Sequence, residues 1–328
     1  MPEVHNFIRP SQAMDSLSQI VLGSAVAEAT FGKKVGNKAI LWGAIAGTIP
    51  DLDVISSWWL DDFTALSIHR GFSHSLVFCV LLSPLFGWLL HKLYSRKNEA
   101  SWKNWSWMFF WCFVTHIALD CLTSWGTQVL WPLPHRFSTN SIFVVDPLYT
   151  IPFLGFVIAV MFFKRSNPKR ARINTIGLII STSYLAFGFV AKARVNSIFK
   201  ESFAQQNIDV IDFESRPAPL NLFLWTANAE TADGYYLGYA SILDKDCNID
   251  YNYVPKNHGI LDKYRGNERV ERVLFMTQGE YTVMETDSCF IVNDLRFGQP
   301  KGWESEPDEF VFRYFLYPEG DTFRVWVP

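Results

Sequence analysis

Seven consecutive residues, His69-Arg70-Gly71-Phe72-Ser73-His74-Ser75, place two imidazoles and a guanidinium immediately before an apolar run, residues 76–90. Placing such charged or polar groups at a membrane boundary costs free energy, so their presence there indicates a functional site. Gly71 allows a sharp backbone turn that would direct both imidazoles inward. Arg70 suits bidentate binding of an anionic phosphate, although pairing with an acidic residue of a loop is an equal alternative.

Two other groups of candidate ligands lie elsewhere in the first half of the chain. Asp51 and Asp53 share one face only if the chain is extended there, whereas His116 and Asp120 lie one turn apart on the same face of a helix. Three imidazoles with several carboxylates and no thiolate suit Zn²⁺ first, with Mn²⁺ or Fe²⁺ as alternatives. The surplus of candidates suggests two or more metal ions that activate a water and clamp an oxyanion. The expected ligands are Asp51, Asp53, His69, His74, His116 and Asp120, with Asp15, Gln19 and Asp146 as further candidates.

Each candidate also has a purely structural interpretation. His69 and His74 would be polar residues at the start of a helix that Ser73 caps. The His116 and Asp120 side chains would form a hydrogen bond inside a helical bundle. Asp51 and Asp53 would cap a short helix, and Asp146 would cap the helix that begins at Pro147. We favour the metal site because the carboxylates and imidazoles are expected to converge.

The elements that must position these groups are apolar and of nearly membrane length. Four runs, roughly residues 72–93, 105–122, 147–163 and 173–191, approach the ~20 residues that span a bilayer. Two shorter runs, 17–31 and 39–49, predict either short tilted spans or a buried helical hairpin, and their Gly and Ala content suits close packing. The sequence therefore predicts a mostly α-helical membrane bundle of about six apolar helices.

The loop charges alternate along the chain. Lys and Arg residues gather at 33–38, 96–103 and 164–172, whereas the loops 51–68 and 123–146 hold one cation, Arg136, and several acids. If basic loops face the cytoplasm, all the candidate site residues lie at the outer face of a bacterial inner membrane. We therefore expect a multi-pass protein whose C-terminal domain lies outside the cytoplasm, with Asp51 and Asp53 on the same side as His69 and His74.

Composition divides the chain into two halves. The chain is 49% hydrophobic and 16% aromatic, yet its mean hydropathy is only +0.08. Residues 1–191 hold 15 Lys and Arg against 10 Asp and Glu, whereas residues 192–328 hold 14 against 22. The second half has no basic stripe, so no nucleic-acid partner is expected. We predict a disordered leader (1–13), a helical membrane domain (14–191) and a soluble α+β domain (192–328).

The C-terminal domain is expected to be mainly an antiparallel sheet. Six segments alternate as strands do, and two segments are predicted to be helices, at 195–206 and 267–276. The predicted strands are 221–228, 235–243, 281–286, 289–295, 310–317 and 322–327. Cys247 and Cys289 would form a disulfide if this domain lies outside the cytoplasm.

Three elements together resemble one family of proteins. Pro50-Asp51-Leu52-Asp53, the element 69–75, and His116-Ile117-Ala118-Leu119-Asp120 followed by Thr123, Gly126 and Leu130-Trp131-Pro132 resemble the YdjM-type membrane-bound metal-dependent hydrolases. The resemblance covers about residues 14–163. It implies a relationship to zinc-dependent phospholipase C and P1 nuclease, with His116 and Asp120 as metal ligands. Relatives often carry a histidine near Gln19, so one metal position is altered here or Asp15 serves instead.

These observations predict a membrane-bound, phosphoesterase-like metal-dependent hydrolase. Its substrate would be a phosphoester in or near the bilayer, such as a lipid head group, so membrane lipid is the expected partner. Asp51, Asp53 or a metal-bound hydroxide would act as the base, and Arg70 would act on the substrate. The alternative is a non-enzymatic membrane scaffold or sensor with a structural metal. A metal or proton transporter would need polar residues that continue to the inner face, and the apolar runs show few.

Overall fold

The computed structural model describes residues 15–60, 62–94, 100–299 and 310–328. The predicted leader, residues 1–13, lies outside the described residues. The chain divides into two compact units. The helical unit comprises Met1–Val54, Ile68–Phe189 and Pro219–Asn221, and the sheet unit comprises Ile55–Ser67, Val190–Ala218 and Leu222–Pro328. The segment 55–67, between two of the sequence motifs, therefore belongs to the sheet unit.

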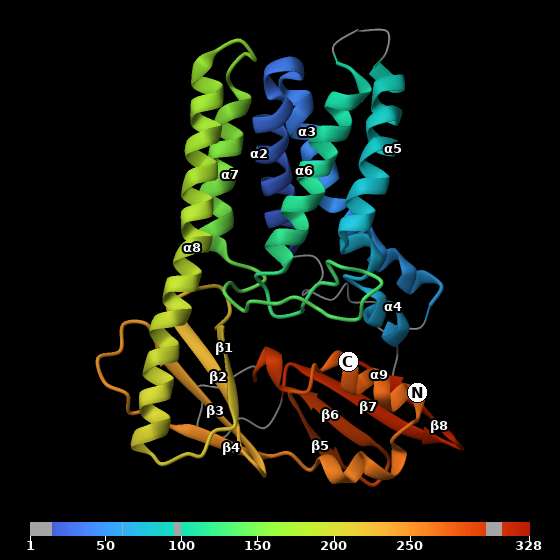
Figure 1. Ribbon diagram of the computed structural model, residues 1–328, viewed down its shortest axis with the longest axis vertical. Helices are drawn as coiled ribbons and strands as arrows, with labels where there is room; N and C mark the ends of the chain where they lie inside the picture. The colour runs from blue at the N-terminus through green and yellow to red at the C-terminus, as the bar shows by residue number, and fades with distance from the viewer. Residues whose placement is uncertain (1–14, 61, 95–99, 300–309) are drawn as a thin grey trace. The chain divides into compact units, whose positions relative to one another are not determined.

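The helical unit is a bundle built around a tight helical hairpin. Helices α2 (Asp15–Val35) and α3 (Asn37–Thr48) lie between α6 (Trp102–Asp120) and α7 (Pro147–Met161), and α5 (Leu76–Tyr94) packs on α6 (Figure 1). Glycines allow the hairpin to close, as expected: a Cβ atom on Gly23 would lie 2.3 Å from the Gly43 carbonyl oxygen, and one on Gly47 would lie 2.3 Å from that of Gln19. Backbones that touch in this way fix the positions of the side chains next to them.

The prediction of about six apolar membrane helices is not confirmed. By length and composition, two described helices are able to cross a membrane, α5 and α8 (Pro168–Gln205). A third span is added if α3 and the 3₁₀ helix η1 (Pro50–Trp58), which meet at a 50° bend, count as one. Helix α7 is apolar but has only 15 residues, about 22 Å. Helices α2 and α6 are long enough but carry buried polar groups such as Gln19 and His116, which lowers their apolar character.

A buried ion pair joins helices at the far end of the bundle from the histidine motif. The Arg170 guanidinium donates to both carboxylate oxygens of Glu28, at 2.7 and 2.6 Å, and also to Asn37 and the Phe163 carbonyl. Both side chains are buried. The pair helps to fix α8 against α2 and α3. Its hydrogen bonds within the unit offset the cost of burying two charges.

The sheet unit contains two four-stranded antiparallel sheets, each a meander. One sheet consists of β1 (Asp212–Pro217), β2 (Leu224–Glu230), β3 (Gly234–Ser241) and β4 (Tyr251–Pro255). The other consists of β5 (Tyr281–Glu285), β6 (Phe290–Asp294), β7 (Phe312–Glu319) and β8 (Thr322–Trp326). The remaining elements are η4 (His258–Tyr264), α9 (Glu268–Met276), η5 (Leu295–Phe297) and the inserted helix α4 (Asp62–Ile68).

The predicted antiparallel α+β character of this unit is confirmed, and three details differ. Strands β1 and β4 were not predicted, because Asp212–Pro217 and Tyr251–Pro255 lack a long alternating apolar pattern. The predicted helix 195–206 is the end of the single long helix α8. The predicted Cys247–Cys289 disulfide is wrong: both thiols are free, with Cys247 after β3 of one sheet and Cys289 before β6 of the other.

Candidate metal centre

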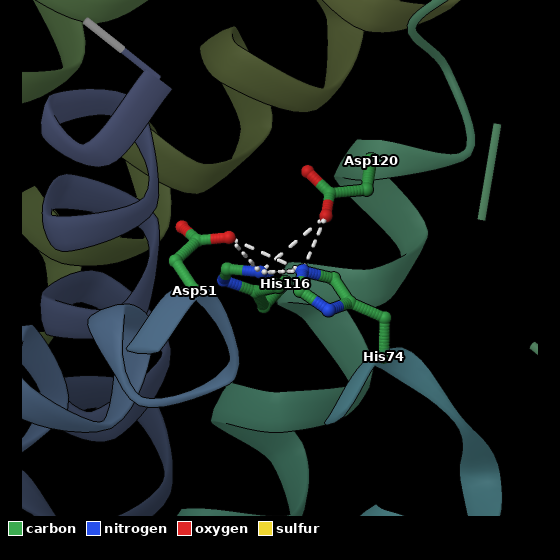
Figure 2. A group of neighbouring side chains, drawn as sticks. All are labelled: Asp51, His74, His116 and Asp120. Atoms are coloured by element: carbon green, nitrogen blue, oxygen red, sulfur yellow. Dashed lines mark hydrogen bonds and ion pairs between the residues drawn. The ribbon is translucent and has the colours of Figure 1, made fainter. Parts of the chain in front are cut away.

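Four side chains from three separate segments converge in the helical unit. Asp51 lies in η1, His74 ends η2 (Phe72–His74), and His116 and Asp120 lie in the last turns of α6. One ligand atom from each lies within 4.8 Å of the others. Figure 2 shows the Asp51 and Asp120 carboxylates reaching the two imidazoles from different sides. The i,i+4 spacing of His116 and Asp120 places them on one helix face, as the sequence predicts.

Five of the six distances among the four ligand atoms are close to those of a tetrahedral set, and the sixth, between the two carboxylate oxygens, is within 4.8 Å. The His74 Nε2 atom lies 3.2 Å from His116 Nε2 and 3.1 Å from both Asp51 Oδ1 and Asp120 Oδ2. His116 Nε2 lies 3.5 Å from Asp51 Oδ1 and 3.4 Å from Asp120 Oδ2. Ligands bound tetrahedrally to Zn²⁺ at ~2.0–2.2 Å are ~3.3–3.5 Å apart. The four atoms therefore need little movement to hold one such ion.

The hydrogen bonds of the outer ring nitrogens direct both Nε2 lone pairs into the cluster. His116 Nδ1 lies 2.8 Å from the Gly47 carbonyl oxygen, which only accepts, so this nitrogen carries the hydrogen. The Ser73 hydroxyl donates to Asp53 Oδ2 at 2.7 Å and therefore accepts from His74 Nδ1 at 2.9 Å. In the neutral rings, both Nε2 atoms are then acceptors, and they face two carboxylates. Such a set of acceptors requires a cation at its centre.

The charge balance of the cluster also favours a cation. Burial alone would lower the pKa of His74, but the surrounding carboxylates of Asp120, Asp51 and Asp53 raise it well above its ordinary value. The same carboxylates that favour a proton on the ring would favour a metal ion bound in its place. Asp120 Oδ2 is buried and has no well-aligned hydrogen-bond donor among the described residues. The residues present therefore fit a divalent metal ion.

Asp120 is held in place by two donors on its other oxygen. Gln19 Nε2 donates to Asp120 Oδ1 at 2.9 Å, and Arg70 Nη2 lies 3.3 Å from the same atom. Arg70 also donates to the Thr123 hydroxyl at 2.8 Å and is buried. Gln19 and Arg70 thus orient a carboxylate whose second oxygen, Oδ2, is left for the cluster, a role that supporting residues commonly have around metal ligands.

The remaining predicted site residues lie outside the four-residue group. Asp53 Oδ1 pairs with His69 Nδ1 at 2.7 Å, and its Oδ2 accepts from the Arg70 amide and from Ser73. Asp146 caps α7 by accepting from the Leu148 amide at 2.9 Å, and it accepts from the Tyr184 hydroxyl at 2.7 Å. Asp15 is the first residue of α2, and its side chain lies outside the described part of the structure.

Two contributions to the centre were not recognised in the sequence. The Gly47 carbonyl orients His116. A contact made by a backbone oxygen cannot be predicted from the types and spacing of side chains. Ser73, which was interpreted as a helix cap, links Asp53 to His74 through its hydroxyl. The only indication of this role in the sequence is that Ser73 lies inside the histidine motif, residues 69–75.

The comparisons with known proteins place the helical part of the chain in a family. No curated protein and no solved structure matches the chain significantly. A family model described as "YdjM inner membrane protein" matches residues 14–195, more than half of the chain and all of the described cluster. Together with the apolar helices, this match supports a membrane location. The chain belongs to the YdjM inner membrane protein family.

Proposed function

We propose that this protein is a membrane-bound metal-dependent hydrolase that cleaves phosphoesters, with a lipid head group as the substrate class. The observation that carries the proposal is the convergence of four acceptor atoms from Asp51, His74, His116 and Asp120 on one point. Two nitrogens and two oxygens this close together favour Zn²⁺ over Mn²⁺ or Fe²⁺. A bound ion would polarise a phosphoryl oxygen and acidify a water.

The centre has one open side. The His74 and Asp120 side chains are 0% and 1% exposed, whereas the Asp51, Asp53 and His69 side chains are 17%, 13% and 17% exposed. Substrate would therefore approach past Asp51. Asp51 is the ligand best placed to yield its position to a water or a phosphoryl oxygen, because it comes from a short 3₁₀ helix and not from the packed end of α6.

The location of the substrate follows from the proposed topology. Basic residues at the ends of α2, α5, α7 and α8 gather at the end of the bundle away from the cluster: Arg165 donates to the Lys34 carbonyl, and Lys34 donates to Asn104. If that end faces the cytoplasm, the cluster faces outward in a multi-pass inner-membrane protein, and the sheet unit lies outside the cytoplasm. The substrate would then be a head group of the outer leaflet.

A structural metal site in a membrane scaffold or sensor is the second candidate. It is favoured by the number of protein ligands, since four closed tetrahedral ligands are typical of structural zinc and three with a water are typical of catalytic zinc. The two candidates differ in what happens at Asp51. A catalytic site tolerates loss of this ligand with the metal retained, whereas a closed structural site loses both metal and stability.

The test combines metal analysis with turnover on detergent-purified full-length protein. We expect about one zinc per chain by elemental analysis, and zinc-dependent hydrolysis of p-nitrophenyl phosphorylcholine or bis-p-nitrophenyl phosphate. His74→Ala should lose metal and turnover, whereas the exposed His135→Ala should keep both. Protein that binds no transition metal would contradict both candidates. If the protein binds zinc but hydrolyses no phosphoester, the structural metal site is the candidate that remains.

A further inference from the structure

His69 forms a hydrogen-bonded pair with Asp53 beside the four-ligand cluster. Its Nδ1 atom lies 2.7 Å from Asp53 Oδ1, and His69 is not a member of the group that converges on one point. Because an ionised carboxylate only accepts hydrogen bonds, Nδ1 carries the hydrogen. In the neutral ring, Nε2 is then an acceptor, so the tautomer of His69 is fixed by Asp53.

Asp53 is held too firmly to act as an adjustable ligand. Its Oδ2 atom accepts from the Arg70 amide at 3.2 Å and from the Ser73 hydroxyl at 2.7 Å, while Oδ1 is engaged by His69. Arg70 has a left-handed backbone, with φ of 58°, which is unfavourable for a residue with a Cβ. In this backbone conformation, the Arg70 amide donates to Asp53. Such a carboxylate orients the imidazole beside it.

The His69 ring lies at the open rim of the centre. Its centroid is 5.7 Å from that of His74, in an edge-on arrangement, and 6.3 Å from that of Trp125. The Arg136 guanidinium donates to the His69 carbonyl at 3.1 and 3.2 Å and so fixes the backbone. The His69 side chain is 17% exposed, and its hydrogen bond to Asp53 is made by Nδ1, not by Nε2. An oriented imidazole that is partly open to solvent thus lies next to the proposed metal ligand His74.

We infer that His69 is a catalytic residue that contacts the attacking water through Nε2, with Asp53 as its positioning residue, and that neither side chain is a metal ligand. The inference rests on the proposed hydrolase function. As the water oxygen bonds to phosphorus, its proton passes to Nε2 and the bond from phosphorus to the alcohol oxygen breaks. The proton then passes from the imidazolium to that alcohol oxygen, so one water and one phosphoester become one alcohol and one phosphate.

The test uses two substitutions at His69 in the full-length, zinc-loaded protein. His69→Asn keeps a donor near the Nδ1 position for Asp53 and removes Nε2. His69→Ala opens a space that free imidazole is able to fill. We expect both variants to retain the zinc content of the wild type. Their kcat should be lower than that of the wild type by ~10²–10⁴-fold, with little change in KM. Added imidazole should restore turnover in His69→Ala. His135→Ala is the matched control and should match the wild type.

The possible results separate the inference from the function on which it rests. Loss of zinc in His69→Asn, or a stoichiometry that falls from two ions to one, would make His69 a metal ligand and overturn the inference while the hydrolase stands. Wild-type kcat in His69→Asn would overturn it as well. A wild-type protein that binds zinc but hydrolyses no phosphoester would overturn both proposals. Asp53→Asn should retain zinc and lose turnover without imidazole rescue, since its histidine is still present.

Discussion

His74 and His116 face each other through their Nε2 atoms at 3.2 Å, although they lie 42 residues apart and belong to η2 and α6. Each ring is fixed from behind, His116 by the Gly47 carbonyl and His74 by Ser73. Two lone pairs held this close repel each other unless a proton or a metal ion lies between the rings and the neighbouring carboxylates. The geometry of the two rings therefore fits a cation between them.

The first prediction concerns the imidazole that is fixed by the backbone. His116→Gln should lower zinc affinity by at least 100-fold, because the amide is a poor ligand and the other three ligands cannot complete a tetrahedron. Isothermal titration with zinc after chelator treatment measures the effect. His91→Gln is the matched control, since His91 contacts the Ala100 carbonyl and is not among the clustered ligands. Equal zinc affinity in His116→Gln and the wild type would contradict the assignment.

The second prediction concerns Gln19, which holds one oxygen of Asp120. Gln19→Ala removes the 2.9 Å hydrogen bond to Asp120 Oδ1 and should weaken zinc binding by ~10–100-fold. Gln19→His should restore much of this loss if its ring donates to Asp120, and should add a second zinc per chain if it becomes a ligand. Elemental analysis separates these results. Unchanged affinity in Gln19→Ala would show that Arg70 alone orients Asp120.

The sequence predicted which side chains lie together better than it predicted the number of spans. The residues of the cluster were all among the candidates because His, Asp and Arg are rare in apolar segments and therefore conspicuous. Their division into four convergent residues and a separate Asp53–His69 pair depends on loop geometry that spacing does not encode. The count of about six spans is not confirmed, and an apolar run also describes a helix buried inside a bundle: Met108, Phe109 and Phe113 of α6 pack in the core.

The third prediction concerns the close approach of α2 and α3. Gly47→Ala would place a Cβ atom 2.3 Å from the Gln19 carbonyl oxygen. The helices must move apart, which displaces both Gln19 and the carbonyl that orients His116, so melting temperature and zinc affinity should fall together. Gly155→Ala is the control, because a Cβ there meets nothing within 4 Å and alanine favours a helix by ~0.5–1 kcal/mol. A Gly47→Ala protein with wild-type zinc affinity would refute this coupling.

The fourth prediction concerns the buried pair of Glu28 and Arg170. Arg170→Ala leaves the Glu28 carboxylate without its bidentate partner and should destabilise the helical unit by about 3–5 kcal/mol. Removing both charges with Glu28→Gln and Arg170→Met should cost less than Arg170→Ala alone. Unfolding in mixed detergent measures both variants. If the double variant is as unstable as the single one, packing and not an unpaired charge explains the loss.

The fifth prediction concerns the pH dependence of the sheet unit. Burial alone would raise the pKa of Glu280, but the Arg216 guanidinium lowers it below its ordinary value of 4.5. Arg216 Nη1 donates to Glu280 Oε2 at 2.8 Å, and Asn228 donates to the same atom at 3.1 Å. A carboxyl whose pKa is depressed by folding stabilises the fold fully above its unfolded pKa, and this contribution is lost as pH falls through the folded pKa.

We therefore expect the sheet unit of the full-length protein to lose stability below about pH 4.5, more steeply in the wild type than in Glu280→Gln. Above that pH, Glu280→Gln should be the less stable protein, because a neutral amide pairs more weakly with Arg216. Hydrogen exchange of the strand peptides, followed by mass spectrometry at several pH values, measures the stability of the sheet unit. Glu319→Gln is the control, since the Glu319 side chain is half exposed and pairs with an exposed arginine, Arg324. Parallel pH profiles for the wild type and Glu280→Gln would show that the ion pair with Arg216 contributes nothing to the acid stability.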